Sequence, residues 1–274
     1  MQIYISYPNG AVYNEICEFD FWDDKTGRGY YYLVNAEGEE ETTEETTEEA
    51  TETKEEENET MTTTKETTEK LAGMICRKHT GKMAEMQSLS TACTLNPYCM
   101  ERAKDPALVC SHCYSMAQQK RYKSLTAKLE RNTEILTGEV YPVEAWPRVN
   151  AAVFRLESFR DLANEIQAVN YFNFCRRNPE TTFALWTKNP FIIARVLASG
   201  AEKPENLIII FSSPCLNKPN AAIMDRFPFI DKVFTVYDKE HAANAEINCG
   251  ARNCNECRRC YSKRTAATVN ELLK

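Results

Sequence analysis

The stretch "TTFALWTKNPFIIARVLASGAEKPENLIIIFS", residues 181–212, contains two apolar runs joined by a helical pattern. The runs "TTFALWT" and "NLIIIFS" are short and strongly apolar, as expected of strands whose two faces are both covered by helices. Between them, Asn189-Pro190 marks the start of a helix and Gly200 marks its end. A strand, a helix and a second strand in this order predict a right-handed crossover between two parallel strands.

The same alternation continues on both sides of this stretch. "AAVFRLE" at 151–157 and "KVFTVYD" at 232–238 are further strands, and the pattern predicts helices over 115–138, over 161–179 and from Pro219. Four such units predict an α/β fold with either an open α/β sheet or a parallel-sheet partial barrel, rather than a complete eight-stranded barrel. In both forms the carboxyl ends of the strands carry the functional face.

Charge and composition divide the chain into three parts. Residues 1–35 contain two β-rich pieces, "QIYISY" and "GYYYLV", and form a small β-rich N-terminal piece. Residues 36–70 hold fifteen Glu against three Lys and almost no apolar residue, which predicts a disordered acidic linker; an interaction tail or nucleic-acid mimic is the alternative. Residues 71–274 form an α/β cysteine-rich domain. Outside the acidic segment the formal charge is about +5, although the whole chain has −7.

The N-terminal sequence and the hydropathy predict a cytoplasmic protein without a membrane partner. The first residues, "MQIYISYPNG", lack the features of a signal peptide, and the longest apolar run, "LIIIF", is far shorter than a membrane helix needs. Thiols rarely form disulfides in a reducing compartment. The twelve cysteines of the chain therefore favour metal binding.

Four of these cysteines are crowded into the C-terminal stretch "NCGARNCNECRRCYSKR". The spacing is C-x4-C-x2-C-x2-C, and the thiols are Cys249, Cys254, Cys257 and Cys260. Structural zinc usually takes two C-x2-C pairs set well apart, whereas a single crowded loop suits a larger body, and C-x4-C-x2-C occurs in plant-type ferredoxins. We therefore favour an iron–sulfur cluster here, with zinc as the alternative.

A second group of cysteines precedes the first predicted helix of the α/β unit. Cys99, Cys110 and Cys113 form a plausible set of three thiolates, and Cys93 is an optional fourth. The loop leads directly into the α/β unit, so we expect it to lie over the carboxyl ends of the strands.

Charged residues follow the first two predicted strands. Arg155, Glu157 and Asp161 follow the strand at 151–157, and Lys188 closes the apolar strand "TTFALWT". Polar residues that converge at strand ends are what a ligand pocket requires, so these four are candidate catalytic residues. The alternative is that Arg155 and Asp161 pair with each other and that Asp161 caps the next helix.

Several landmarks resemble one known family. "KHTGKMAEMQSLSTACTLNPYC", "CSHCY", "VFRLESFRDL", "TFALWTKNP", "NLIIIFSSP" and "NCNECRRCY" occur in the order seen in the phage gene product eighty-eight domain family, over about residues 78–262. The resemblance implies the fold and the cysteine landmarks, and a place in the host cytoplasm for a phage-encoded chain, but no particular reaction. Where the family reads Ser-Gly-Asp, this chain has Phe159, Arg160 and Asp161, so a glycine is missing.

A more distant similarity links the layout to radical S-adenosylmethionine enzymes, which place three cysteines ahead of a helix in a parallel partial barrel. Their first spacing is three residues, whereas Cys99 and Cys110 are separated by ten. This similarity implies one or two [4Fe–4S] clusters, S-adenosylmethionine as a cofactor, and an electron donor and an unknown substrate as partners. The competing hypotheses are a nucleic-acid-binding module, supported by basic residues around Tyr261, and an electron-transfer protein, each with structural zinc or iron–sulfur sites.

Overall fold

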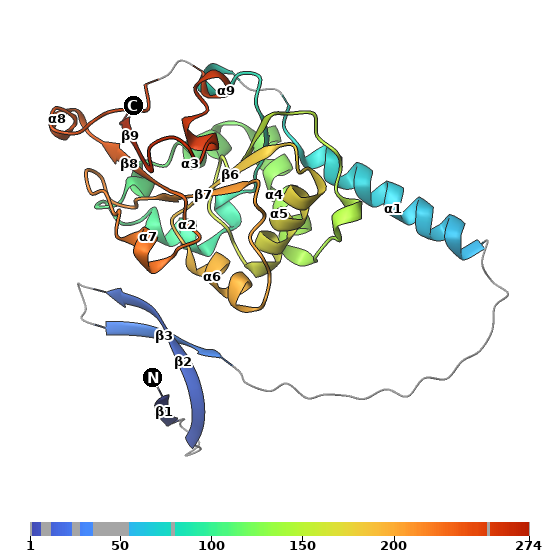
Figure 1. Ribbon diagram of the computed structural model, residues 1–274, viewed down its shortest axis with the longest axis horizontal. Coiled ribbons are helices and arrows are strands. Elements are labelled where there is room, and N and C mark those ends of the chain that lie inside the picture. The colour runs from blue at the N-terminus through green and yellow to red at the C-terminus, as the bar shows by residue number, and fades with distance from the viewer. Residues whose placement is uncertain are drawn as a thin grey trace. The chain divides into compact units, whose positions relative to one another are not determined.

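The computed structural model describes residues 2–6, 12–23, 28–34, 55–77, 80–250 and 253–273. The chain forms two units, which divide after Thr53 (Figure 1). The first unit contains an antiparallel sheet in the order β1-β2-β3, with β1 at Gln2–Ser6, β2 at Val12–Asp23 and β3 at Arg28–Val34. The two β-rich pieces seen in the sequence supply β1 and β3, and the strand between them was not predicted.

The second unit begins with a long helix, α1, at Glu55–Met74. The predicted linker therefore ends earlier than residue 70, and its part at 36–54 lies outside the described residues. Glu, Lys and Met are strong helix formers, and the end of the helix is anchored because Leu71, Met74 and Ile75 are buried in the core. The acidic composition did not reveal this anchor, because the apolar residues follow the acidic segment instead of interrupting it.

The second unit is built on six parallel strands in the order β4-β5-β6-β7-β8-β9. The α/β class with a parallel sheet is thus confirmed, and the sheet is not closed into a barrel. The strands are β4 at Gln87–Leu89, β5 at Val153–Leu156, β6 at Thr182–Thr187, β7 at Leu207–Ser212, β8 at Lys232–Tyr237 and β9 at Thr268–Leu272. Four of them correspond to the predicted strands, whereas the edge strands β4 and β9 were missed.

Helices follow the strands as the sequence predicts, with one break. The predicted helix over 115–138 is divided into α3 and α4, because Tyr122 has an extended conformation with φ −117° and ψ 94°. Asn164 begins α5, its side chain accepting a hydrogen bond from the Gln167 N–H at 3.0 Å. The helices after α1 are α2 at Pro97–Arg102, α3 at Tyr114–Arg121, α4 at Lys123–Gly138, α5 at Glu165–Arg177, α6 at Phe191–Ala198, α7 at Ile223–Arg226, α8 at Lys239–Ala242 and α9 at Cys254–Cys257. Short 3₁₀ turns lie at Gly81–Met83, Cys93–Leu95, Val109–His112, Val143–Ala145 and Arg259–Tyr261. No helix in the described ranges is long and apolar enough to cross a bilayer.

One face of the sheet packs against helices and forms the main core. Phe154 of β5 contacts Phe174 of α5 with ring centroids 5.2 Å apart, and Phe183 of β6 joins them. Leu185 and Ile209 continue this layer and are fully buried. Figure 1 shows α5 and α6 along this side of the sheet. Burial of large apolar side chains here is the main stabilising contribution of the second unit.

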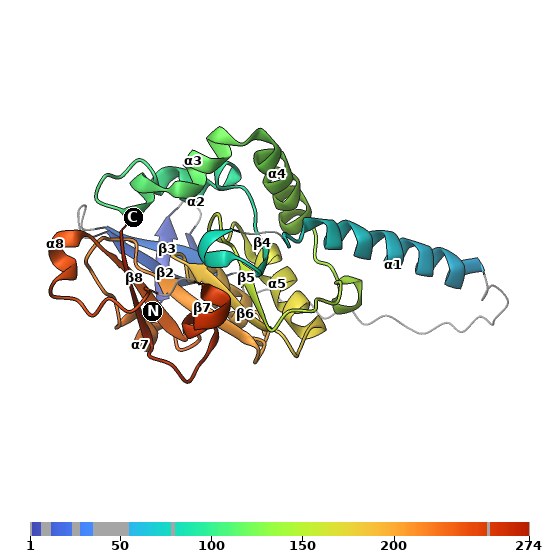
Figure 2. The same cartoon turned by 90° about the horizontal axis from the view of Figure 1, so that it is seen from above.

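The other face of the sheet is not covered by long helices, which corrects the expectation from the apolar strands. Val153, Ala184, Ile208 and Ile210 form a smaller apolar layer with Tyr261 of the C-terminal cysteine segment. In Figure 1 that segment and α9 lie opposite α6, and Figure 2 shows α2, α3 and α4 in one band along the domain. Apolar strands alone cannot distinguish a helical cover from an irregular one, because both exclude water equally.

Candidate functional site

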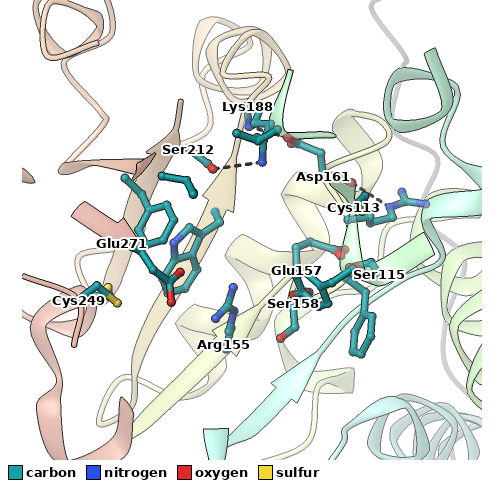
Figure 3. A pocket seen from close by; sticks show the side chains of 18 of the residues that line it. Cys113, Ser115, Arg155, Glu157, Ser158, Asp161, Lys188, Ser212, Cys249 and Glu271 are labelled. Carbon is teal, nitrogen blue, oxygen red and sulfur yellow. Dashed lines mark hydrogen bonds between the residues drawn. The ribbon is translucent and has the colours of Figure 1, made fainter. Parts of the chain in front are cut away.

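Strand alternation places one set of polar and aromatic side chains on the face opposite the main core. Side chains two residues apart in a strand point the same way. Because Phe154 belongs to the main core, Arg155 points to the other face, and the same reasoning applies to Trp186, Ser212 and Glu271. Over this face lies a cavity of about 600 Å³, which is within the size range of small-molecule sites (Figure 3).

Both cysteine groups line this single cavity. All eight thiols are free: Cys93, Cys99, Cys110, Cys113, Cys249, Cys254, Cys257 and Cys260. The four candidate catalytic residues line the same cavity: Arg155, Glu157, Asp161 and Lys188. In Figure 3, Cys113 and Cys249 lie on opposite sides of the cavity, with Arg155 between them in that view. The structure thus brings together every site residue that the sequence singled out.

Backbone and side-chain hydrogen bonds hold the N-terminal cysteine segment across the ends of the strands. Asn96 donates to the carbonyls of Asp161 and Leu162 at 3.0 and 3.1 Å, beyond the end of β5. Tyr98 donates its hydroxyl proton to the Lys188 carbonyl at 2.9 Å, beyond β6. The Val109 N–H donates to the Pro214 carbonyl at 2.8 Å, beyond β7. The segment therefore crosses three strand ends in turn.

Two thiols of this segment interact directly. Cys93 is buried, donates a hydrogen bond to Cys113, and accepts one from Gln119 Nε2 at 2.7 Å. The Cys93 hydrogen bond lowers the pKa of Cys113, and the backbone N–H groups of Met116 and Ser115 at the start of α3 lower it further. The same hydrogen bond and burial raise the pKa of Cys93. Cys113 is therefore the thiol most readily converted to the thiolate that a metal requires.

The other two thiols of this segment are held close to charged groups. Burial raises the pKa of Cys99 to about 12, and the Asp161 carboxylate raises it as well, although the Asp161 N–H donates to the sulfur. Burial also raises the pKa of Cys110, while the Lys188 ammonium lowers it. A bound cation would remove these penalties, because thiolate is the ligand form.

The C-terminal cysteine segment is attached to both the sheet and an early part of the domain. Tyr261 is buried against Trp186 with ring centroids 6.0 Å apart. Lys82 donates to Glu271 Oε1 at 2.8 Å, to the Cys249 carbonyl at 3.3 Å and to Cys249 Sγ at 3.7 Å. Arg258 has a left-handed conformation, with φ 49°, and ends α9 with the tight turn that precedes Cys260. Because Tyr261 is buried, it is not available to stack on a nucleic-acid base.

Burial raises the pKa values of Cys249 and Cys254, and raises that of Cys260 to about 12. The charges of Arg155 and Lys82 lower the pKa of Cys254. Each cysteine group thus has cations beside it that would offset thiolate charge. Within the described ranges, no three Cys, His, Asp or Glu side chains converge into a ready site for a single metal ion.

Glu157 is fully engaged by neighbouring donors. Its carboxylate accepts hydrogen bonds from Thr91 Oγ1 at 2.6 Å, from the Tyr171 hydroxyl at 2.5 Å and from Gln167 Nε2. The side chain is 2% exposed, the backbone has φ 51°, and burial raises the pKa of the carboxyl group. Glu157 therefore shapes the turn after β5.

Asp161 joins the ends of two strands. Its carboxylate accepts from Thr187 Oγ1 at 2.6 Å and from the Lys188 N–H at 2.5 Å. Asn164 caps the next helix, and Arg155 stacks on Trp186 instead of pairing with Asp161. The alternative pairing considered from the sequence is therefore wrong on both counts.

The comparison with known proteins agrees with these landmarks. A model of the family described as gene product 88 matches residues 41–271, which include all eight cysteines and the cavity lining except Leu272 and Leu273. The chain belongs to the phage gene product 88 family. No curated protein and no solved structure matched it. The family match is wider than the resemblance seen in the sequence and extends into the acidic segment.

In this gene product 88 protein, three residues that the sequence did not single out also contribute to the cavity. The orientation of Trp186 could have been predicted from strand alternation, since Ala184 of the same strand points to the same face. No sequence pattern indicated the contact between Lys82 and Glu271, because the two residues are 189 positions apart and only the completed sheet brings them together. Their hydrogen bond fixes the position of Cys249.

Proposed function

We propose that this protein is an iron–sulfur enzyme of the radical S-adenosylmethionine type. In the proposal Cys99, Cys110 and Cys113 hold a [4Fe–4S] cluster, and the C-terminal cysteines hold a second cluster. The observation that carries the proposal is that both thiol groups line one cavity at the carboxyl ends of the strands. A purely structural metal would need no shared cavity.

The donor chemistry supports this proposal. Thiolates are the usual ligands of iron–sulfur clusters, and Cys113 already has a lowered pKa. Lys188 faces Cys110, and Lys82 and Arg155 face the C-terminal thiols, so negative clusters would be charge-balanced. When bound, a three-thiolate cluster supplies an electron for the reductive cleavage of S-adenosylmethionine.

The protein's own residues would position the reactants. Asp161 holds the end of β6 and donates its N–H to Cys99, so it fixes that thiol relative to Lys188. Trp186 and Tyr261, whose rings contact each other, form an aromatic wall of the cavity. Lys188 donates to Ser212 Oγ at 3.1 Å, so its ammonium group is held over β7.

The contact between Cys93 and Cys113 supports a second candidate function, electron transfer. If Cys93 supplied a fourth thiolate, the N-terminal cluster would have no open iron and would only carry electrons. The two candidates differ in one measurable property, the ligand count of this cluster.

The test begins with anaerobic purification and analysis of iron, sulfide and zinc. Electron paramagnetic resonance of the reduced protein then compares samples with and without S-adenosylmethionine, in a variant with the four C-terminal cysteines replaced by serine. A shifted signal, with release of methionine and 5′-deoxyadenosine, supports the enzyme. An unshifted signal together with loss of the cluster in Cys93→Ala supports electron transfer, and zinc in place of iron refutes both candidates.

A further inference from the structure

Arg155 has an unusual environment for a cation inside a protein. Its guanidinium group lies over the Trp186 ring, 4.1 Å from the centroid. Among the described residues, its buried Nε atom has no hydrogen-bond partner, and the acceptor found for Nη1 is the Met83 sulfur at 3.9 Å. Within the described ranges, no carboxylate forms an ion pair with it; the ionisable groups that face it are Tyr114, Tyr261, Cys254 and Cys260.

Other cations of the cavity differ from Arg155 in this respect. Arg160 donates to the Asp161 carbonyl at 2.8 Å, to the Ala92 carbonyl at 3.1 Å and to Gln167 at 2.9 Å. Lys82 pairs with Glu271. Burying part of a guanidinium group without supplying a hydrogen-bond acceptor is costly, so a cavity that retains such a group is suited to an anion.

A second unpartnered donor lies close to Arg155 in the chain. Ser158 Oγ is buried without a hydrogen-bond partner, and Ser158 lines the same cavity (Figure 3). The other buried side-chain atoms that lack partners in the described part of the chain belong to Gln87, Trp146 and Thr235, none of which lines this cavity. Both unpartnered atoms of the cavity, Arg155 Nε and Ser158 Oγ, can therefore donate a hydrogen bond to an oxygen atom of a ligand.

We propose that Arg155 and Ser158 bind an oxoanion group, a carboxylate or phosphate, of the enzyme's substrate. A guanidinium group that lies over an aromatic ring can keep its N–H edge free, and that edge binds oxoanions with two parallel hydrogen bonds. Trp186 and Phe234 line the cavity beside it, so the remainder of the ligand would be apolar or aromatic. Calling this ligand a substrate rests on the proposed function, whereas the binding of an oxoanion does not.

The oxoanion could also be the carboxylate of S-adenosylmethionine. The thiols that face Arg155 are Cys254 and Cys260 of the C-terminal group, but Tyr114, which directly follows Cys113 of the proposed cofactor site, faces it as well. We assign the group to the substrate, and the test below separates the two sources.

The test is equilibrium dialysis of the full-length, anaerobically purified protein with radiolabelled inorganic phosphate and, in parallel, radiolabelled benzoate. Arg155→Gln should weaken binding of the better probe at least tenfold, and Ser158→Ala should weaken it severalfold. The matched control is Arg102→Gln, because Arg102 also lines the cavity and stacks on an aromatic ring, Tyr98, at 4.6 Å. This control should change binding less than twofold.

Several results would overturn the assignment. Binding that is unchanged in Arg155→Gln, equal losses in Arg102→Gln, or no binding of either probe by the native protein would each refute an oxoanion subsite. Loss of iron in Arg155→Gln would mean that Arg155 only balances cluster charge. Loss of S-adenosylmethionine binding in that variant would assign the oxoanion to the cofactor. Because iron content is measured separately, failure of the cluster proposal is distinguishable from failure of this one.

Discussion

Replacing Lys82 by Met should release the C-terminal cysteine segment. The Lys82–Glu271 pair is short, 2.8 Å, and its side chains are only 27% and 23% exposed, so water screens it poorly. A charge-assisted hydrogen bond of this kind contributes about 2 kcal/mol, and Glu271 would lose its lysine partner in a half-buried position. For a domain of this size, about 2 kcal/mol corresponds to a fall of roughly 4–8 °C in melting temperature.

The assay is thermal unfolding followed by circular dichroism, together with iron analysis of the same samples. Lys104→Met is the matched control, because the Lys104–Glu101 pair has a similar length, 2.7 Å, but its side chains are 71% and 76% exposed. The control should change the melting temperature by no more than about 2–4 °C, since exposed pairs contribute at most about 1 kcal/mol. A double-mutant cycle with Glu271→Gln isolates the pair. If Lys82→Met has the melting temperature of the native protein, or if the cycle shows no coupling, the Lys82–Glu271 pair does not hold the C-terminal cysteine segment.

Three further predictions test other parts of the structure. Cys257→Ser should lower both the iron content and the melting temperature, because metal binding contributes to folding. Cys215 does not line the cavity, so Cys215→Ser should keep the iron, and equal iron loss in both variants would contradict the cluster assignment. Leu71→Ala should cost about 2–4 kcal/mol, because Leu71 is fully buried at the end of α1, while Leu95→Ala, 46% exposed, should cost less than about 1 kcal/mol in urea unfolding. Burial raises the pKa of Glu157, so its carboxyl group holds a proton more tightly in the folded chain than in the unfolded chain. The free energy of unfolding should therefore decrease as pH rises from about 4.3 toward the raised pKa, and Glu157→Gln should flatten that part of the profile of stability against pH.

The central strands were predictable because their sequences are apolar over their whole length. β6 and β7 bury both faces, and no other element type suits short runs such as "LIIIF" bounded by polar residues. β4 has only three residues, and β9 reads "TVNEL", so neither is recognisable before its neighbour offers hydrogen bonds. The formation of an edge strand depends on pairing with its neighbour more than on its own amino-acid composition.

The candidate site was predictable in its residue types but not in its contacts. Cysteine spacing and strand ends identified the two thiol groups, Arg155 and Lys188 directly from local patterns. The partners of Arg155 and Asp161 were not predictable, because the choice between an ion pair and separate contacts depends on Trp186 and Thr187 from the next strand. Local sequence specifies which groups reach the cavity, and only the assembled sheet determines which of them remain unpartnered.

The position of β9 has a consequence for the synthesis of the protein. β9 is the last strand of the described residues, it pairs with β8, and its Glu271 contacts Lys82, 189 residues earlier. A ribosome must therefore deliver almost the whole second unit before the C-terminal thiols can lie over the cavity, while Cys99, Cys110 and Cys113 emerge much earlier. At about 5–20 residues per second, roughly 7–30 seconds pass between the synthesis of the first thiol group and that of the second. During that interval the C-terminal segment does not cover the N-terminal thiols. They are therefore accessible to oxidants, and to the cluster insertion that the proposed function requires, before β9 pairs with β8.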